Sequence, residues 1–540
     1  MKKASKFLAP VLALVLIACM VVPAFAAAQT GYTISNPYAN VDWDTVNQYK
    51  AALHTHTTAS DGKSTLRQSI ERHVESDFDI IATTDHSTTN YSWINENYNF
   101  LVHTALNIFK GNLGLDYLGT SGSFNDGITY TLGANENNDE ILTVNTTNFN
   151  NKVYGEGVLD TVVDKTVGNQ KQILRVPYGN EQNGLSANAH VTSWFADYNN
   201  IVPLATYNLA IRNVDRLGGL CVINHPGEYS KARYEIYSAD AYNEESDIKQ
   251  YKYFNNKCAS LIDTYDACIG IDMNSKGDSR TRFDRILWDN LLTRFSAAGK
   301  NVFGIASSDA HRLDVIDTGS VVALMKNLSS AELKNALKNG EFFAQSTCIG
   351  NPTELDQIAK ALKDYYGVTD MYNEIKAVVN ELENKAEQIT DGDIDADEHL
   401  DTEYSFLNDE GYRKTATTPE ITSINTNDAA QTITLNTKNA LLVRWISNGT
   451  LVATSKASGG VATLDLKNYS GKLGNYVRAE VFGEGGIVYT QAFLLNQSEN
   501  AKSGAVVVDK SFVDIGVIDC LVMMAGNWYD MIMRLVGDLF

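Results

Sequence analysis

The chain is short of cysteine and of positive charge. Its 540 residues include six cysteines with no Cys-x-x-Cys pair, so a dense disulfide framework is not expected. Cys221 lies in an apolar run and is expected to be buried, while a pairing of Cys258 with Cys268 stays open. Lysine and arginine number 44 against 65 aspartates and glutamates, a formal net charge of −21. Nucleic acids and anionic membranes bind basic patches, so this balance argues against both as partners, but not against metal ions.

Two familiar binding motifs are present only in part. Gly62-Lys63-Ser64-Thr65 resembles the end of a phosphate-binding loop, but Thr57 stands where that motif needs its first glycine. The acidic run at residues 391–398 resembles the start of a calcium loop. It has Ala396 in place of the required glycine and Thr402 in place of the bidentate glutamate, so a solvated acidic linker is the better interpretation.

Residues 1–28 are predicted to be a secretory signal. Three lysines stand among the first six residues, an apolar stretch follows, and Ala24-Phe25-Ala26 offers a small-x-small cleavage site. A lipoprotein signal that ends at Cys19 is the alternative. We therefore expect an exported protein that is secreted or held at the cell envelope.

The histidines gather where apolar runs end. His54 and His56 follow such a run, and residues two apart on a strand face the same way, so the pair could hold one metal ion. Asp61 follows in a polar turn. The theme recurs four times, and six of the nine histidines fall at these places. The residues with ligand-type side chains at the later run ends are Asp85, His86, Glu181, His190, His225, Asp309 and His311.

Helix-like patterns lie between these runs. Leu66, Ile70 and Val74 recur every four residues, which predicts a helix over residues 65–76. His73 lies off this apolar stripe and is expected to be solvated.

Strands that alternate with helices favour an α/β barrel-like fold over residues 30–350, which leaves room for further domains in so long a chain. A barrel of this kind brings the C-terminal ends of its strands to one face. The candidate ligands would then meet at that face. Residues 87–171 contain no ligand cluster and are interpreted as an elaboration that faces the substrate.

Past residue 350 the character of the chain changes. Residues 352–415 are predicted to form a helical, acidic insertion. Short strand-like runs over residues 417–496, with Asn448-Gly449 as a hairpin turn, predict an all-β, Ig-like sandwich. Residues 505–540 are apolar but too often interrupted by charges for a membrane span. The sandwich or this tail could contact the cell envelope.

The motifs taken together resemble those of the PHP (polymerase and histidinol phosphatase) superfamily of metal-dependent hydrolases, over about residues 48–350. The matching motifs are His54-Thr55-His56, Ser60-Asp61-Gly62, Thr84-Asp85-His86, Gly179-Asn180-Glu181, His190, Asn224-His225-Pro226 and Ser308-Asp309-Ala310-His311. The resemblance implies a distorted (β/α)7 barrel that holds two or three divalent metal ions.

The resemblance also implies which residues hold each ion. The ligands of the first ion would be His54, His56, Glu181 and Asp309. Glu181 would bridge to a second ion, whose further ligands would be His190 and His225. The ligands of the third ion would be Asp61, His86 and His311. Glu136 is the rival bridging carboxylate, and Glu181 is preferred because a histidine follows it in a β-like run.

Imidazole and carboxylate ligands without thiolate suit zinc, manganese or iron. Such ions supply a hydroxide near neutral pH and neutralise charge on phosphoryl oxygens. The expected catalytic residues are His225 and Asp85, the latter as a group that orients His86. Lys63, Arg67 and Arg312 stand beside candidate ligands and could meet a phosphate, although a surface role is equally compatible with each.

The expected activity is hydrolysis of a small-molecule phosphate ester. Hydrolysis of a non-phosphate ester or amide is an alternative, because a metal-bound hydroxide also attacks carbonyl groups. A second alternative is a surface binding protein whose barrel is structural and whose sandwich does the binding.

Overall fold

The computed structural model describes most of the chain from residue 31 to residue 513. The described residues are 31–94, 114–125, 127–145, 166–167, 170–182, 190–199, 206–226, 249–275, 281–347, 352–369, 417–497 and 508–513, with a few others between 372 and 380 and residue 506. The predicted signal segment, the acidic linker and most of the C-terminal tail lie outside them. No helix in the described ranges is long and apolar enough to span a membrane.

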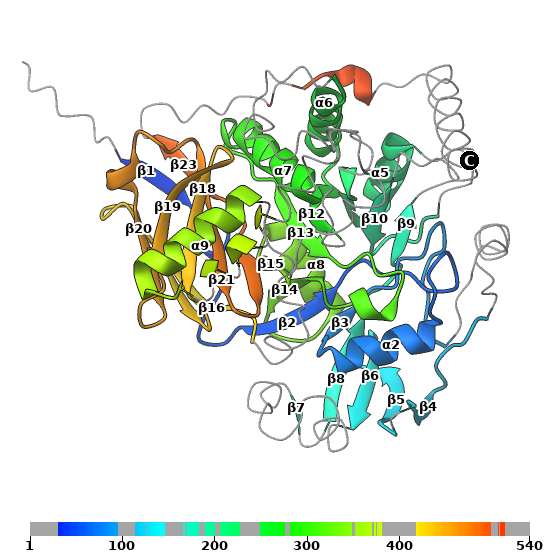
Figure 1. Cartoon of the computed structure of the whole chain (residues 1–540). Coiled ribbons are helices and arrows are strands. Elements are labelled where there is room, and N and C mark those ends of the chain that lie inside the picture. Colours follow the sequence, from blue (N-terminus) through cyan, green and yellow to red (C-terminus); the bar gives the residue numbers. More distant parts are fainter. Residues whose placement is uncertain are drawn as a thin grey trace, which may run out of the picture.

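The fold is mixed α/β, with more of the described residues in strands than in helices (Figure 1). The helices are α2 (Leu66–Glu75), α5 (Tyr207–Arg216), α6 (Lys249–Thr264), α7 (Thr281–Ser296), α8 (Ser330–Asn339) and α9 (Pro352–Tyr366). Short 3-10 helices cover Leu313–Val315, Leu466–Tyr469 and Lys510–Phe512.

The largest sheet has 15 strands and continues through three regions of the chain. Its central strands are β2 (Asn47–Ala52), β3 (Ile80–Ile81), β8 (Gln170–Arg175), β14 (Gly319–Met325) and β15 (Phe342–Ser346). One side is extended by β4 (Ser121–Ser123), β5 (Thr129–Ala134), β6 (Glu140–Asn145) and β7 (Thr166–Val167). The other side is extended by β1 (Tyr32–Ser35), β18 (Leu442–Ser447), β19 (Thr450–Lys456), β21 (Tyr476–Gly483), β22 (Gly486–Tyr489) and β23 (Phe493–Gln497).

Two smaller sheets complete the described fold. The five-stranded sheet contains β9 (Asn180–Gln182), β10 (Val191–Trp194), β11 (Leu220–Ile223), β12 (Cys268–Ser275) and β13 (Phe303–Ser307). The three-stranded sheet contains β16 (Glu420–Asn427), β17 (Thr432–Lys438) and β20 (Val461–Asp465).

The expected (β/α)7 barrel is not confirmed, because the described strands form separate sheets and no closed barrel. Parallel pairs join β2, β3 and β8 in the large sheet and β11, β12 and β13 in the five-stranded sheet. Two isolated parallel bridges, Thr55–Ala310 and His86–Glu181, connect the ends of these strands across the sheets. The bridges lie at the strand ends that carry the candidate ligands, so the sheets meet there without being paired along their length.

The helix predicted over residues 65–76 is confirmed as α2, which begins with a capping box between Thr65 and Gln68. The expectation that His73 is solvated is wrong, because its side chain is fully buried. Its Nδ1 lies 2.7 Å from the Ser69 carbonyl oxygen, and its ring packs edge-on against Phe78 with centroids 5.0 Å apart. A local hydrogen bond to the preceding turn thus satisfies one ring nitrogen inside the core, while the buried Nε2 has no hydrogen-bond partner among the described residues.

The three-stranded sheet packs on β18 and β21 as one layer on another. Ile421 and Leu435 of this sheet share a hydrophobic core with Trp445 and Val481 of the large sheet. The large sheet continues without a break from β15 to β22, whose register pairs Ala344 with Tyr489. The predicted limits of the β-sandwich therefore stay a prediction, since its strand β22 is hydrogen-bonded to β15, which lies in the segment predicted to form the barrel.

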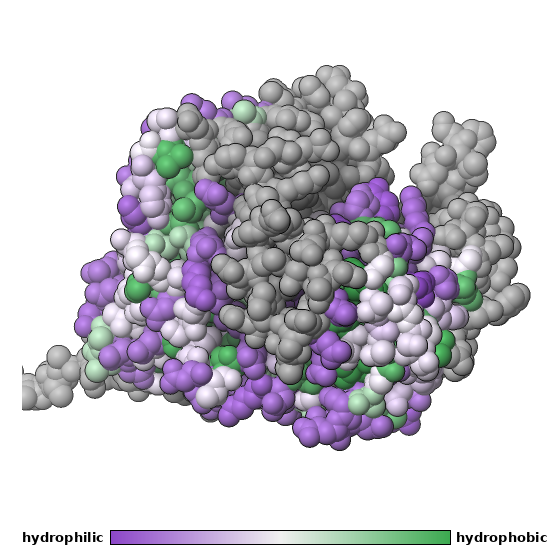
Figure 2. All heavy atoms as spheres, turned by 90° about the horizontal axis from the view of Figure 1, so that it is seen from below, coloured by the Kyte–Doolittle hydropathy of each residue, from purple (hydrophilic) through white to green (hydrophobic). Residues whose placement is uncertain are grey.

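Of the cysteines, Cys221, Cys258 and Cys268 are buried and free. The burial of Cys221 was expected. Cys258 and Cys268, whose pairing the sequence left open, form no disulfide bond with each other. On the face shown in Figure 2, hydrophilic residues dominate the described surface and hydrophobic ones occur in small groups between them. This polar surface agrees with the strongly negative charge of the sequence.

Candidate metal centre

The candidate ligands come from strand ends in both the large and the five-stranded sheet. His54 and His56 follow β2, and His86 follows β3. Asp309 and its neighbour His311 follow β13. The remaining ligands are contributed by the five-stranded sheet, with Glu181 in β9, His190 directly before β10 and His225 two residues after the end of β11. Because β10 runs antiparallel to β11, the start of one strand and the end of the other reach the same edge.

The deepest group consists of His54, His56 and Asp309. The Nε2 atoms of the two histidines lie 3.1 Å apart. Asp309 Oδ1 lies 3.3 Å from His54 Nε2 and 3.0 Å from His56 Nε2. These three ligand atoms lie close enough together to hold one ion, and all three residues are buried.

Glu181 stands at the centre of the cluster. Its carboxylate oxygens lie 2.6 Å from His86 Nδ1, 3.0 Å from His190 Nδ1 and 3.4 Å from His225 Nε2. Glu181, His86 and His190 form a second group able to hold an ion. The rival Glu136 lies exposed in the turn after β5, whereas Glu181 is fully buried among the histidines.

A third group surrounds Asp61. Asp61 Oδ1 lies 3.1 Å from His311 Nε2 and 3.5 Å from both His86 Nε2 and His56 Nδ1. His86 therefore touches two groups, whereas the expected assignment gave it to this one alone. His225 belongs to none of the three groups, but its Nε2 lies 3.4 Å from Glu181 and 3.7 Å from Asp309.

The electrostatics of the cluster favour bound cations. Burial alone would raise the pKa of Glu181, but His190, His86 and His54 hold it well below its ordinary value. Burial alone would lower the pKa of His54, but Asp309 and Glu181 raise it to about 10. The carboxylate therefore stays ionised, and His54 takes up a proton where no other cation supplies the charge. Imidazoles and carboxylates in this arrangement fit divalent zinc, manganese or iron.

Asn224 holds the central carboxylate in place. Its buried side-chain amide donates hydrogen bonds of 2.7 Å to Glu181 Oε1 and 2.7 Å to Thr192 Oγ1. Its amide oxygen accepts a bond of 3.3 Å from the Thr192 backbone. Asn224 belongs to the motif Asn224-His225-Pro226, but the sequence alone indicates no role for it, since its partner lies 43 residues away.

Asp85 holds the turn that leads to Asp61 and does not contact His86 in the way expected. Its buried carboxylate accepts hydrogen bonds from the Thr57 backbone and hydroxyl, both at 2.7 Å. It also accepts bonds from the Ser60 backbone at 3.1 Å and hydroxyl at 2.6 Å. Gly62 closes this turn, because a Cβ there would lie 2.7 Å from the His56 carbonyl carbon. The positioning role of Asp85 thus concerns the Asp61 turn.

Asp272 is a further carboxylate beside the cluster, and it lies outside the motifs quoted above. It is fully buried in β12, with Oδ2 at 3.9 Å from His54 Nδ1, and it accepts a hydrogen bond from Ser307. The run Ile269–Met273, which is apolar apart from Asp272, is typical of a buried strand. A carboxylate buried in an apolar strand needs a polar partner. The acidic residue inside this run was therefore the signal in the sequence that could have indicated a nearby polar site.

The backbone is strained at the cluster. Two candidate ligands, His225 and Asp309, have positive φ values of 23° and 43°. Ser87, Tyr178 and Phe195, which lie close in sequence to other candidates, have φ values of 48°, 58° and 63°. Such conformations are costly for residues other than glycine and collect at functional sites.

The expected phosphate-binding residues are only partly placed at the cluster. The Lys63 backbone N–H donates a 2.8 Å bond to the His311 carbonyl oxygen, and its side chain is exposed. Arg312 is exposed and forms two bonds, of 3.1 and 2.9 Å, with Asp314. Arg67 bonds to Tyr130 and Ser123 of the β4–β5 region. Arg312 and Arg67 are thus engaged with other protein groups.

No protein-family model matches the chain, and no curated protein matches it. Among solved structures, it is similar to a two-domain protein from Bacteroides vulgatus that contains a predicted PHP-like metal-dependent phosphoesterase. The identity is 12% over 84% of this chain and 88% of that chain, with a TM-score of 0.31. It is also similar to a proposed metal-dependent phosphoesterase from Bifidobacterium adolescentis, at 16% identity over 48% of this chain and 87% of that chain, with a TM-score of 0.20. Similarity this distant does not establish an activity for the chain.

Proposed function

We propose that the chain is an exported metal-dependent hydrolase that cleaves a small-molecule phosphate ester with the help of two or three divalent ions. The observation that carries this proposal is the buried cluster around Glu181, in which three groups of histidines and carboxylates lie within reach of one another. Ions held so close together would activate a water molecule and neutralise the charge that develops on phosphoryl oxygens.

The cluster has a closed and an open side. The side chains of His54 and His56 have no exposed surface, and that of His225 has 3%. The outer side chains are partly exposed, by 28% for His311, 15% for Asp61, 14% for His190 and 11% for His86. A substrate would therefore reach the ligands from the side of these outer residues.

The residues of the cluster have different roles in this proposal. His54, His56 and Asp309 form the deep wall, and Glu181 links it to the outer histidines. Asn224 and Asp85 keep Glu181 and the Asp61 turn in position before substrate arrives, which reduces the cost of reorganisation during the reaction. His225, enclosed between Glu181 and Asp309, acts as a ligand in this scheme and not as a group that exchanges protons with solvent.

Activity measurements on the metal-reconstituted protein test the proposal. The full chain, freed of metal with a chelator and dialysed, would be supplied with zinc, manganese or iron. Aryl phosphate monoesters and diesters, an aryl acetate and an aryl amide would then be offered as substrates. We expect metal-dependent hydrolysis of a phosphate ester, reduced at least a hundredfold in the double variant His54→Ala/Asp309→Ala.

The other outcomes separate the alternatives. Hydrolysis of the acetate or amide without the phosphate esters would favour a carboxylic ester hydrolase or amidase. A protein that binds metal but cleaves none of these compounds, or one that binds no metal, would favour the surface binding protein.

A further inference from the structure

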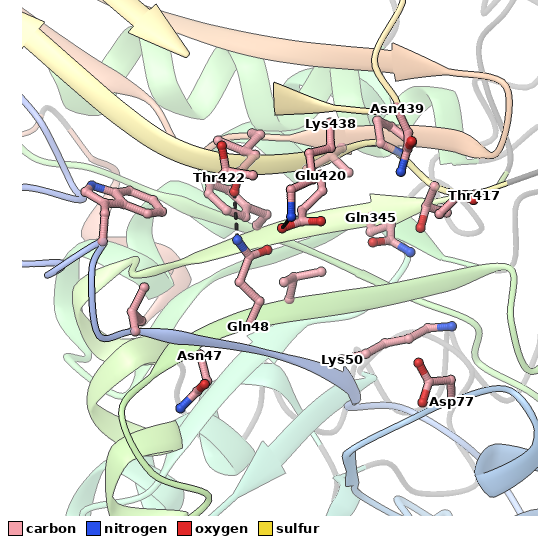
Figure 3. Close-up of a pocket in the computed structure, with 18 residues that line it drawn as sticks. Asn47, Gln48, Lys50, Asp77, Gln345, Thr417, Glu420, Thr422, Lys438 and Asn439 are labelled. Carbon is pink, nitrogen blue, oxygen red and sulfur yellow. Dashed lines mark hydrogen bonds and ion pairs between the residues drawn. The ribbon is translucent and has the colours of Figure 1, made fainter. Parts of the chain in front are cut away.

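A pocket of about 580 Å³ lies between the large sheet and the three-stranded sheet. One wall comes from β2, β14 and β15, and the other from β16 with Lys438 and Asn439 at the end of β17 (Figure 3). Its volume is in the range of small-molecule sites, about 300–1,000 Å³. The pocket residues Gln48 and Lys50 precede His54 by six and four positions, which at about 3.3 Å per residue places them roughly 13–20 Å along the chain from the metal centre.

The inner surface of the pocket is apolar and partly aromatic. Phe343, Ile421 and Val488 are buried there. Trp43 lies half-buried beside them, with its ring stacked on that of Phe343 at a centroid distance of 6.5 Å and an angle of 14°. A flat aromatic wall of this kind can accept the apolar face of a ring-shaped ligand.

The rest of the lining is rich in uncharged polar groups. Four carboxamides and three hydroxyls line the pocket, those of Asn47, Gln48, Gln345, Asn439, Thr417, Thr418 and Thr422. Gln48 is fixed by a 2.7 Å hydrogen bond from its amide nitrogen to the Ile421 carbonyl oxygen, drawn in Figure 3. Carboxamides and hydroxyls both donate and accept hydrogen bonds, so they can bind ligand hydroxyl groups in either sense.

The charges of the lining cancel. Lys50 pairs with Asp317 at 2.5 Å, and Lys438 lies 3.7 Å from Glu420. The fourth charged group, Asp77, pairs with Lys171. The two lysines and two carboxylates in the pocket sum to zero, so an anionic or cationic ligand would meet no excess of opposite charge.

We propose that this pocket binds a short neutral saccharide. One face of a sugar ring would lie against Trp43, and the hydroxyl groups of the saccharide would form hydrogen bonds with the carboxamides and threonines of the pocket. An apolar ligand would leave the polar lining unpaired, which is costly in a partly enclosed site. The site is separate from the metal centre, and the proposal does not depend on the hydrolase activity. It gives the chain a second ligand of a different chemical class.

Binding of neutral sugars to the full chain tests the proposal. The panel would contain glucose, galactose, mannose, N-acetylglucosamine, cellobiose and chitobiose, with glucuronate as a charged comparison. Saturation-transfer NMR would detect binding, and calorimetry would give its strength. We expect at least one neutral sugar to bind, and binding at least tenfold weaker after Thr422→Trp fills the pocket.

Three controls make the test specific. Thr432→Trp makes the same exchange on β17, at a half-buried threonine outside the pocket, and should bind sugar as the unaltered chain does. Gln345→Met removes a carboxamide with little change in volume and should weaken binding. The double variant His54→Ala/Asp309→Ala should lose metal and keep its sugar affinity.

The proposal is overturned if no neutral sugar of the panel binds or if glucuronate alone binds. It is also overturned if Thr422→Trp leaves the affinity unchanged. Loss of sugar binding in the metal-centre variant would place the sugar at the other site and contradict the proposal as well.

Discussion

Glu181 is the residue on which the candidate metal centre depends most. It lies within 3.5 Å of five histidines: His54, His56, His86, His190 and His225. A single carboxylate shared so widely must be held in one orientation if it is to bridge two ions. The hydrogen bond from Asn224 supplies that constraint. Groups that orient metal ligands in this way influence affinity nearly as much as the ligands do.

Asn224→Ala should therefore weaken metal binding about 10–100-fold while the protein stays folded. The alanine leaves Glu181 without its amide donor, so the carboxylate can turn away from the outer histidines. Metal titration by calorimetry measures the affinity, and circular dichroism reports the fold. Asn255→Ala, which removes another buried carboxamide, bonded to Arg294, is the matched control and should bind metal normally. Equal affinities in the two variants would show that Asn224 does not position Glu181.

At the scale of helices and strands, the sequence predicts what depends on neighbours in the chain. The apolar stripe of α2 and the apolar runs before His54, His225 and Asp309 are local patterns, and helix and strands are found there. The sheet order could not be predicted, because it depends on distant pairs such as Thr55 with Ala310. The antiparallel extension by β4, β5 and β6 was missed for the same reason, since residues 87–171 were interpreted only as an elaboration that faces the substrate.

The candidate site was easier to predict than the fold that carries it. Histidines at strand ends are chemically distinctive, so the residues could be selected before their arrangement was known. The failures concern polar residues whose environment is set by contacts in space, such as Asp85 with Thr57. His73 failed for a different reason, because periodicity treats every polar residue as exposed, even one bonded to its own helix.

The buried His73 predicts a dependence of stability on pH that belongs to α2. Burial lowers its pKa from 6.5 to about 4, so the folded chain binds fewer protons than the unfolded chain between these values. Its contribution is fully present above pH 6.5 and is lost as the pH falls towards 4. Between pH 7 and pH 5 the free energy of unfolding should fall by about 2 kcal/mol through this residue alone.

Chemical denaturation of the unaltered chain and of His73→Gln at both pH values measures this effect. The variant should show a pH-dependent loss smaller by about 2 kcal/mol, whatever its stability at pH 7. An identical loss in both proteins would mean that His73 is not buried in its neutral form.

At the scale of the whole molecule, a buried ionic network joins the C-terminal strands to the helices of the metal-binding part. Arg478 of β21 makes two bonds, of 2.8 and 2.7 Å, to Asp289 of α7 and a third of 2.7 Å to Glu480. Arg444 of β18 bonds to Glu480 and, at 2.7 Å, to Gln357 of α9. Together with the pairing of β15 and β22, this network predicts that the two parts unfold as one unit.

Arg478→Met should lower the free energy of unfolding by about 3–5 kcal/mol, because it leaves the buried Asp289 carboxylate without its cationic partner and takes one of two arginines from Glu480. Lys300→Met removes an exposed ion pair with Asp263 and should cost about 1 kcal/mol or less. Denaturant unfolding followed by tryptophan fluorescence measures both. A second transition in the unaltered chain, or equal losses in the two variants, would contradict the joined arrangement.

The metal content of the chain, purified without chelator, tests the central claim most directly. Mass spectrometry of the elements should find two or three zinc, manganese or iron ions per chain. The double variant His54→Ala/Asp309→Ala should hold fewer, and His73→Gln, a buried histidine outside the cluster, should hold as many as the unaltered chain. A chain that contains no metal and takes up none of these ions when they are added would contradict the account.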